Sequence, residues 1–454
     1  MKRFLGKSVL VILFSVLAAG LLFAGSEKES SAPTKEVKKE PVKVGFLAAL
    51  SGPYSASGED SVRGAQLAVD EINAKGGFLG RPVEMVVIDT KALVDEHPVE
   101  AVDELVLKHK VLFIGGGVSD SIGWAVRERA AFHETPYLGW VPWDSMATRG
   151  DNIYPLHWVT GPDTEVLMWC MWPYLLKNNL VPKDVVILGP DYEWGWANAK
   201  AAVKPIEAFG GRVVKMIYTP TPTVKFDTFI AQIQDLMPNG GTITANNGGS
   251  EMLETFHEIY AAGLLDKGYA FVKNNVYGPT SYGPIPQEEL EGVYALNEYY
   301  PYLPGDKKHE AWVEKFYKKY GLLPGSNTFS AYLVMHAAAD GIKATGSLDP
   351  NEWIPAVQGT VRTGLLTDGE YMFQNLTGRL LWPIVLMRGK SPKDMKDIYP
   401  TLPDVGPEWD KFEIVHTFDV DYQLMVVSEE DLLAGTPIGG EGIGDKVIEY
   451  WKNK

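Results

Sequence analysis

The chain has 454 residues, and its 58 acidic and 42 basic side chains give a formal net charge of −16. This balance disfavours nucleic acid and anionic membrane surfaces as partners, because both are bound by basic faces. The single cysteine, Cys170, excludes an internal disulfide and any metal site that needs two cysteines. The 46 glycines and 30 prolines predict many turns and disfavour a coiled coil.

The amino end has the pattern of a secretory signal. Lys2, Arg3 and Lys7 precede the apolar run 9–23, and small residues cluster around Ala24. The run is shorter than the roughly 20 apolar residues of a spanning helix, although an uncleaved anchor is the alternative. We therefore expect a signal peptide over 1–24, a flexible polar tether over 25–40, and export to the periplasm or the outer face of the cytoplasmic membrane.

From residue 42 onward, short apolar runs alternate with amphipathic segments, which is typical of parallel sheets with helices packed on them. The alternation occurs in two series of similar length, so two similar α/β lobes are expected. The first series has strands at 42–50, 83–89, 111–115 and 136–141, and helices at 61–75, 95–109 and 120–133. The second has helices at 163–177, 194–209, 226–237 and 251–262, and strands at 184–189, 212–218, 242–246 and 269–273.

The order changes in the last third of the chain. A loop rich in glycine, proline and tyrosine is expected over 279–305, with an irregular tail ending at Lys454. Between the loop and the tail we expect helices at 307–320 and 329–345, and strand-like runs at 371–373, 380–387 and 415–419. Periodicity alone does not show to which lobe these segments belong.

The familiar catalytic and cofactor motifs are missing. Neither a glycine-rich phosphate loop nor an HExxH or GxSxG pattern occurs. Cys170 lies in an apolar helical stretch and is expected to be a core thiol. The glycines at 115–117 either make a tight turn or admit an anion at the helix that follows, where Ser119 or Asp120 is a natural N-cap. We predict no catalytic residue, no metal and no cofactor.

Ligands of open α/β sheets bind beyond the carboxyl ends of the strands. Aromatic side chains gather in these loops: Tyr54, Trp140, Trp143, Tyr192, Trp194, Trp196 and Tyr277. Amides and hydroxyls accompany them: Ser57, Ser119, Ser121, Asn246, Asn247 and Asn274. Aromatic walls with a few polar groups are typical of a small-molecule site, and core packing is the alternative for each tryptophan.

Two stretches carry a family resemblance: VGFLAALSGPYSASG (44–58) and RGAQLAVDEINAKGG (63–77). With ATRG (147–150) and Thr160-Gly161, they resemble periplasmic solute-binding proteins of the leucine/isoleucine/valine-binding type, the receptors of amino-acid ABC transporters. The resemblance covers roughly 42–386 and weakens after 279. It implies a type I fold, with two doubly wound lobes joined by three crossings. The implied segments are lobe 1 at 41–159, lobe 2 at 160–278, a return to lobe 1 at 279–365, and completion of lobe 2 with the tail at 366–454.

The resemblance also implies which residues touch the ligand. The chain departs from the family at Pro142, which has no N–H, and at residues 273–275, where Lys-Asn-Asn replaces the acid that holds an ammonium. A ligand with a carboxylate or amide and an apolar or aromatic body is therefore expected. If the ligand carries an ammonium, Asp120, Asp191 or Glu251 could pair with it. The ligand-binding residues expected are Tyr54, Ser57, Ser119, Asp120, Ser121, Trp140, Val141, Trp143, Tyr192, Asn246, Asn247, Lys273 and Asn274.

Three functions remain open from the sequence. The first is a monomeric transport receptor whose partners are a small solute and a membrane ABC permease. The second is a ligand-sensing ectodomain or regulator of the same fold. The third, a secreted hydrolase, is disfavoured by the missing motifs.

Overall fold

The computed structural model describes residues 39–454 except 53, 92–96, 118, 224, 304, 365 and 368. The expected signal peptide and residues 25–38 of the expected tether lie outside the described residues. No helix in the described part of the chain combines the length and the apolar character needed to cross a membrane.

The first sheet consists of β1 (Val42–Ala48), β2 (Val83–Asp89), β3 (Ile114–Gly116), β4 (Tyr137–Gly139) and β5 (His157–Val159). All five strands are parallel and lie in the order β2-β1-β3-β4-β5. The strand order reverses between β1 and β3. In doubly wound sheets this reversal is the switch point beyond which ligands bind.

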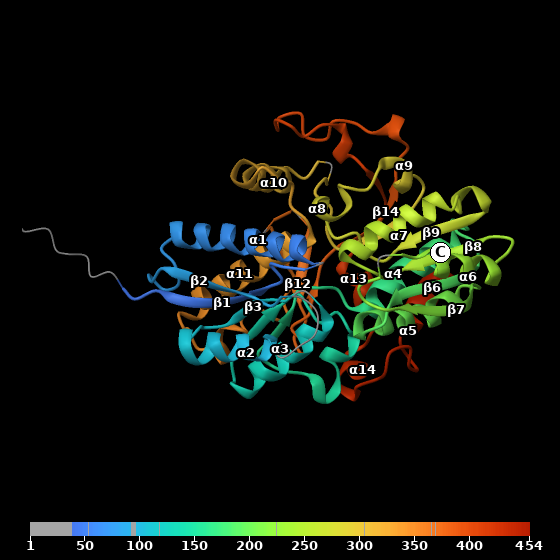
Figure 1. Cartoon of the computed structure of the whole chain (residues 1–454). Helices are drawn as coiled ribbons and strands as arrows, with labels where there is room; N and C mark the ends of the chain where they lie inside the picture. Colours follow the sequence, from blue (N-terminus) through green and yellow to red (C-terminus); the bar gives the residue numbers. More distant parts are fainter. Residues whose placement is uncertain are drawn as a thin grey trace, which may run out of the picture. The chain divides into compact units, whose positions relative to one another are not determined.

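Helices cover both faces of this sheet because β1 is apolar on both sides. Val44 and Phe46 pack in one buried cluster with α1 (Ser55–Ala74) and α11 (Ser326–Thr345). Leu47 packs in another cluster with α2 (His97–Asp103) and α3 (Asp120–Phe132). Figure 1 shows α1 on one side of the sheet and α2 and α3 on the other.

The second sheet repeats this pattern and extends it. Its order is β15-β14-β10-β9-β8-β6-β7, and the five strands from β10 to β7 are parallel, with a second switch point between β6 and β8. β14 and β15 are antiparallel additions. The strands are β6 (Asp184–Pro190), β7 (Arg212–Thr219), β8 (Gly241–Ala245), β9 (Tyr269–Lys273), β10 (Tyr294–Asn297), β14 (Ile384–Gly389) and β15 (Phe412–Phe418). The helices are α4 (Thr164–Lys177), α5 (Glu193–Ala208), α6 (Asp227–Leu236) and α7 (Gly249–Ala261).

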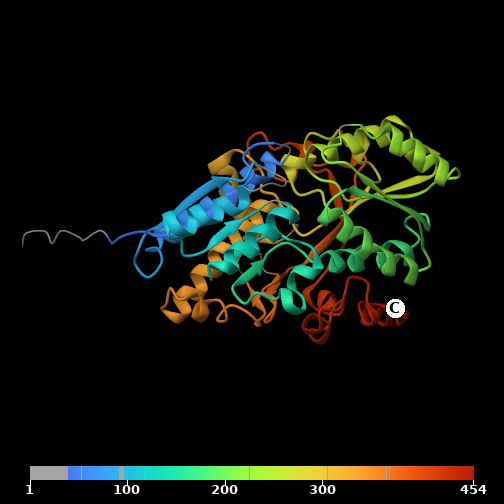
Figure 2. The same ribbon diagram turned by 60° about the horizontal axis from the view of Figure 1, so that its bottom comes forward.

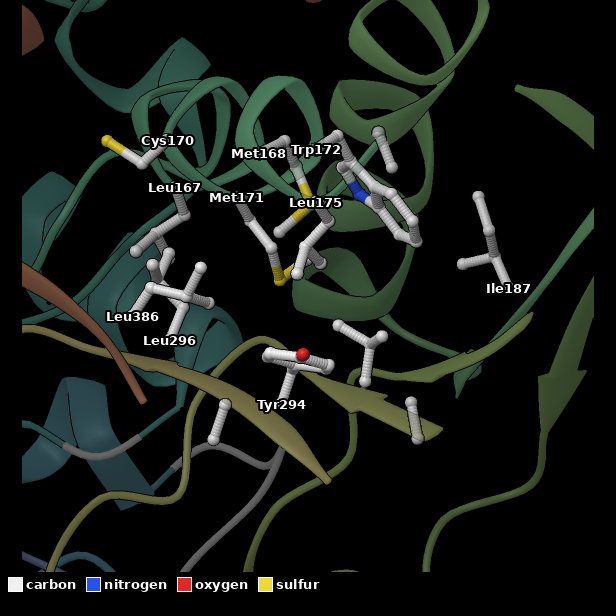
Figure 3. Packing of buried hydrophobic residues seen from close by; sticks show 14 of the residues in the cluster. Leu167, Met168, Cys170, Met171, Trp172, Leu175, Ile187, Tyr294, Leu296 and Leu386 are labelled. Atoms are coloured by element: carbon white, nitrogen blue, oxygen red, sulfur yellow. The ribbon is translucent and has the colours of Figure 1, made fainter. Parts of the chain in front are cut away.

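The core of the second lobe is built around α4. Leu167 of α4 points toward Leu296 of β10 and Leu386 of β14 in Figure 3, and all three belong to one buried cluster. Cys170 is a buried free thiol, and burial raises its pKa well above the usual range of a cysteine. The expectation that Cys170 packs in the core is therefore confirmed.

The last third differs from the expected segments. The loop expected over 279–305 contains β10, which pairs with β9 and β14, so the chain stays with the second sheet until Asn297. It then returns to the first core through α10 (Lys307–Tyr320) and α11. Tyr371 and Phe373 also lie in that core, so completion of the second lobe begins at β14 rather than at residue 366. The small third sheet consists of β11 (Arg362–Thr363), β12 (Glu370–Phe373) and β13 (Leu380–Leu381).

The tail expected to be irregular contains helices that pack back on the second lobe, as its red segment shows in Figure 2. The Tyr422 hydroxyl donates to the Trp169 carbonyl at 2.9 Å and accepts from Trp451 Nε1 at 2.8 Å. Among the described residues, six short helices were not indicated by the sequence, because so few turns rarely display an apolar period. The short helices are α8 (Pro279–Tyr282), α9 (Gln287–Leu290), α12 (Pro350–Trp353), α13 (Val420–Leu424), α14 (Glu429–Ala434) and α15 (Asp445–Lys452).

Candidate ligand-binding site

A small cavity lies where the loops that follow strands of both sheets meet. The loops follow β1, β3, β4, β6 and β9, so both switch points contribute. The lining residues are Tyr54, Ser57, Ser119, Asp120, Trp140, Val141, Trp143, Tyr192, Trp194 and Tyr277.

Aromatic rings form most of the wall. The ring centroid of Trp143 lies 5.3 Å from that of Trp140, 6.4 Å from that of Trp194 and 6.4 Å from that of Tyr277. Trp194 and Tyr277 are also 6.4 Å apart. Trp140 and Trp143 come from a loop of the first sheet, but they pack in the buried cluster of the second lobe. The indole nitrogens of Trp140 and Trp143 have no hydrogen-bond partner among the described residues.

Asp120 is the one acidic side chain among the described residues of the lining, and it holds the tryptophan loop in place. Its carboxylate accepts hydrogen bonds from the backbone N–H groups of Trp143, at 2.9 Å, and Asp144, at 3.1 Å. Burial raises the pKa of the Asp120 carboxyl to about 7 despite these two donors, and the nearby charge of Asp144 adds to the effect.

The residues before Asp120 shape the start of α3. Ser119 caps this helix by accepting a hydrogen bond from the N–H of Ile122 at 3.4 Å, which confirms it as the N-cap. Gly116 and Gly117 have φ angles of +91° and +101°. A Cβ on Gly117 would lie 2.6 Å from the Tyr137 hydroxyl, so a tight turn explains this glycine run.

Two side-chain contacts join the lobes beside the cavity. The hydroxyls of Tyr54 and Tyr192 are 3.3 Å apart, and the Ser121 hydroxyl donates to the Glu193 carboxylate at 2.5 Å. Burial raises the pKa of both tyrosines above their ordinary value, which keeps these hydroxyls protonated. Ser121 therefore bridges α3 and α5 and does not line the cavity, contrary to its expected role.

Comparison with known proteins places this architecture in a family. A family model described as "Periplasmic binding protein" matches residues 41–391, which is most of the chain. The chain belongs to this family. The resemblance to the leucine/isoleucine/valine-binding type, and the type I fold it implied, are thereby confirmed.

Individual relatives of this periplasmic binding protein are distant. A Leu/Ile/Val-binding protein homolog of Brucella abortus is 25% identical over 204 residues, which are 42% of this chain and 49% of that protein. The chain thus spans about half the length of the curated relatives it matches. An amino acid ABC transporter substrate-binding protein from Pseudomonas fluorescens has a TM-score of 0.74 and 20% identity, over 84% of this chain and 96% of the other. A solute-binding protein from Rhodopseudomonas palustris, solved with 3,4-dihydroxybenzoic acid, has a TM-score of 0.71 and 17% identity, over 84% of this chain and 98% of the other.

Eight of the expected ligand-binding residues line the cavity of this periplasmic binding protein. Four others, all from the second lobe, do not. Lys273 is buried, and its ammonium donates to the Ala245 carbonyl at 3.1 Å and to Asn247 Oδ1 at 3.2 Å. Asn274 donates to Asn198 at 2.8 Å. Asn246 is fully buried, and its amide has no hydrogen-bond partner among the described residues. Lys273, Asn247 and Asn274 bond to other buried polar groups at the ends of β8 and β9 instead of facing the cavity.

Trp194 and Tyr277 line the cavity but were not among the ligand-binding residues expected. Both belong to the aromatic set at the strand ends, directly after β6 and β9. The family resemblance assigned them no role, whereas the general rule on strand ends would have included them. Among the described residues, no group of three or more histidine, cysteine or acidic side chains could hold a metal ion.

The Ser121–Glu193 bridge leads to a prediction about affinity. Ser121→Ala should weaken solute binding by up to about tenfold, because a hydrogen bond to a charged group contributes about 1.5–3 kcal/mol and only part of it is lost on exposure to water. Ser51→Ala is the matched control, since Ser51 donates to Asp89 at 3.0 Å within one lobe. Isothermal titration calorimetry measures both variants. Equal affinities would show that the bridge does not contribute to binding.

Proposed function

We propose that this protein is the extracytoplasmic receptor of an ABC transporter, which captures a small solute between its lobes and presents it to a membrane permease. One observation carries the proposal: a single cavity is lined by strand-end loops of both sheets. Tyr54 from one lobe and Tyr192 from the other meet at its edge, so a solute there would touch both lobes and favour their closure.

The proposal includes export and a monomeric receptor. The sequence pattern of residues 1–24 supports a signal peptide, and the association of this family with ABC permeases supports a location outside the cytoplasm.

The proposed receptor binds its solute without chemical change. Ser57, Ser119 and Asp120 are the polar, non-aromatic side chains of the described lining, and no histidine accompanies them as a general base. Light scattering of the purified protein tests the monomer.

We infer a solute about as large as an amino acid or a small aromatic acid. The names of two similar proteins support this size: one is a Leu/Ile/Val-binding homolog and one was solved with 3,4-dihydroxybenzoic acid. The expected preference for a carboxylate or amide rested on Ser119, Ser121 and Lys273. Of these three, Ser119 alone lines the cavity, so these residues do not indicate the charge of the solute.

A thermal-shift panel with closure measured by small-angle scattering tests the receptor function. A true solute at 100 times its dissociation constant stabilises the protein by about 2.7 kcal/mol, which raises its Tm by several degrees. The same solute should reduce the radius of gyration. A panel of amino acids, aromatic acids, amines and sugars that leaves Tm unchanged would contradict the receptor function, and stabilisation without a smaller radius would contradict closure.

A further inference from the structure

The wall of the cavity has the geometry that favours a positive charge. Trp143, Trp194 and Tyr277 lie with ring centroids 6.4 Å from one another, and Trp140 adds a fourth ring beside Trp143. The face of an aromatic ring carries negative electrostatic potential, and it attracts a cation whose centre lies within about 6 Å of the centroid. Alkylated ammonium groups suit such walls because they combine charge with an apolar surface.

The charged groups around the cavity also favour a positively charged solute. No lysine, arginine or histidine is among the described lining residues, whereas Asp120 is, and it is 2% exposed. Two buried cations that interact electrostatically with acids of this region, Lys273 and Arg379, are hydrogen-bonded to other groups. Lys273 bonds to Ala245 and Asn247, while Arg379 donates to the Gly161 carbonyl at 3.2 Å and lies 3.8 Å from Asp163. An anionic solute would therefore meet a carboxylate and no free cation.

Helix N-termini could in principle favour an anion, and among the described residues α1, α3, α5 and α7 begin near the cavity. Three of these helices have a carboxylate in the first turn, Asp120 in α3, Glu193 in α5 and Glu251 in α7, whereas α1 has none. A carboxylate at this position balances the positive end of the helix dipole. The N-termini of α3, α5 and α7 consequently offer little unbalanced positive potential to a solute, whereas the N-terminus of α1 is not balanced in this way.

We propose that the solute is a small organic cation whose alkylated ammonium group lies against Trp143, Trp194 and Tyr277, with Asp120 as its counter-ion. This proposal rests on the receptor function proposed above. The unpaired indole N–H groups of Trp140 and Trp143 leave donors for an oxygen on the same solute, such as a hydroxyl or carboxylate.

Calorimetry with a charged and a neutral molecule of the same shape tests the charge. The probes are choline, tetramethylammonium and glycine betaine, with 3,3-dimethylbutan-1-ol as the neutral isostere of choline, and leucine and benzoate for comparison. At least one methylated ammonium should bind, and choline should bind at least tenfold more tightly than its isostere. Binding of leucine or benzoate with none of the three methylated ammonium probes would overturn the cation while leaving the receptor function intact. Binding of no probe, with no response across the thermal-shift panel, would overturn both.

A pair of tryptophan variants separates the aromatic wall from general effects on α5. Trp194→Phe keeps an aromatic ring but weakens the attraction to a cation, because indole is the strongest of the aromatic faces. It should weaken the binding of the tightest methylated ammonium probe about five- to tenfold. Trp196→Phe is the control on the same helix, because Trp196 is 40% exposed and donates to Asp191. Equal affinities in the two variants would contradict contact between the cation and Trp194.

The pH dependence of affinity gives the sign of the solute charge independently. Burial raises the pKa of Asp120 to about 7 and that of Glu251 to about 6, and it lowers the pKa of Lys273 to about 7. All three groups become more negative, or less positive, as the pH rises from 5.5 to 8. Asp144 and Arg379 also lie near Asp120. Four tyrosines surround it as well, and their raised pKa values keep their hydroxyls neutral in this range: Tyr54, Tyr137, Tyr192 and Tyr277. Affinity for the cation should therefore increase with pH, and a decrease would contradict the proposal.

Discussion

Replacing Arg149 with methionine should lower the free energy of unfolding by about 3–5 kcal/mol, because it leaves the buried carboxylate of Glu165 without its cation. The side chains of Arg149 and Glu165 are both 0% exposed and form an ion pair. Arg149 also donates to the Thr436 carbonyl at 2.8 Å, and Glu165 accepts from the N–H of Gly439 at 2.5 Å. The pair thus ties the ATRG segment and the start of α4 to the C-terminal tail.

The matched control is Arg212→Met. Arg212 pairs with Asp184 through side chains that are 69% and 44% exposed, and such surface pairs contribute at most about 1 kcal/mol. Urea denaturation measures both variants. In Arg149→Met the pKa of the unpaired Glu165 should lie above its value in the unfolded chain. The Glu165 carboxyl is then more protonated in the folded protein at pH 5 than at pH 8, so the loss of stability should be smaller at pH 5. Similar small losses in both variants would mean that the buried pair is not structurally important.

Gly161→Ala should both destabilise the protein and weaken solute binding. A Cβ at this position would lie 1.9 Å from Trp143 Nε1 and 2.1 Å from the Trp140 carbonyl oxygen, so the indole or the backbone of the tryptophan loop must move. Forced repacking of this kind costs about 1–3 kcal/mol. Because Trp140 and Trp143 line the cavity, affinity should also fall at least tenfold.

Gly189→Ala provides the control for this substitution, since Gly189 also lies at a strand end of the buried interior. The nearest atom to its added Cβ would be the Gly195 Cα at 3.5 Å, an ordinary contact. Thermal unfolding and calorimetry compare the two variants. If Gly161→Ala bound solute as well as Gly189→Ala, the position of Trp143 would not determine the site.

The repeated strand and helix pattern allowed the fold to be predicted as far as residue 278, because long amphipathic helices have a strong period and strands buried on both faces form continuous apolar runs. β2 and β9 begin and end at the expected residues, and α10 does as well. β5 and β10 were missed, because three and four residues are too few to show a period; β3 and β4 are as short, but the apolar runs at 111–115 and 136–141 indicated them. The boundary at 279 differed for the same reason, since β10 keeps the chain in the second sheet.

The aromatic half of the site followed from one rule: ligands bind beyond the carboxyl ends of parallel strands. That rule selects Trp140, Trp143 and Tyr192 without any relative. It does not say which polar side chain faces the cavity and which bonds to its neighbours. Lys273 and Ser121 were both expected to face the solute, yet one binds carbonyls at strand ends and the other bridges to Glu193. Such choices depend on hydrogen-bond partners from distant segments, which a single sequence does not reveal.

A crystal structure of the complex tests the central claim most directly, using the compound that gives the largest thermal shift. We expect this compound to lie between Trp143, Trp194 and Tyr277, with a positively charged group facing the Asp120 carboxylate. A compound bound outside this cavity would contradict the proposed site, for instance in the surface groove lined by Arg388 and Lys393. A compound bound inside it with a carboxylate facing Asp120 would contradict the proposed charge.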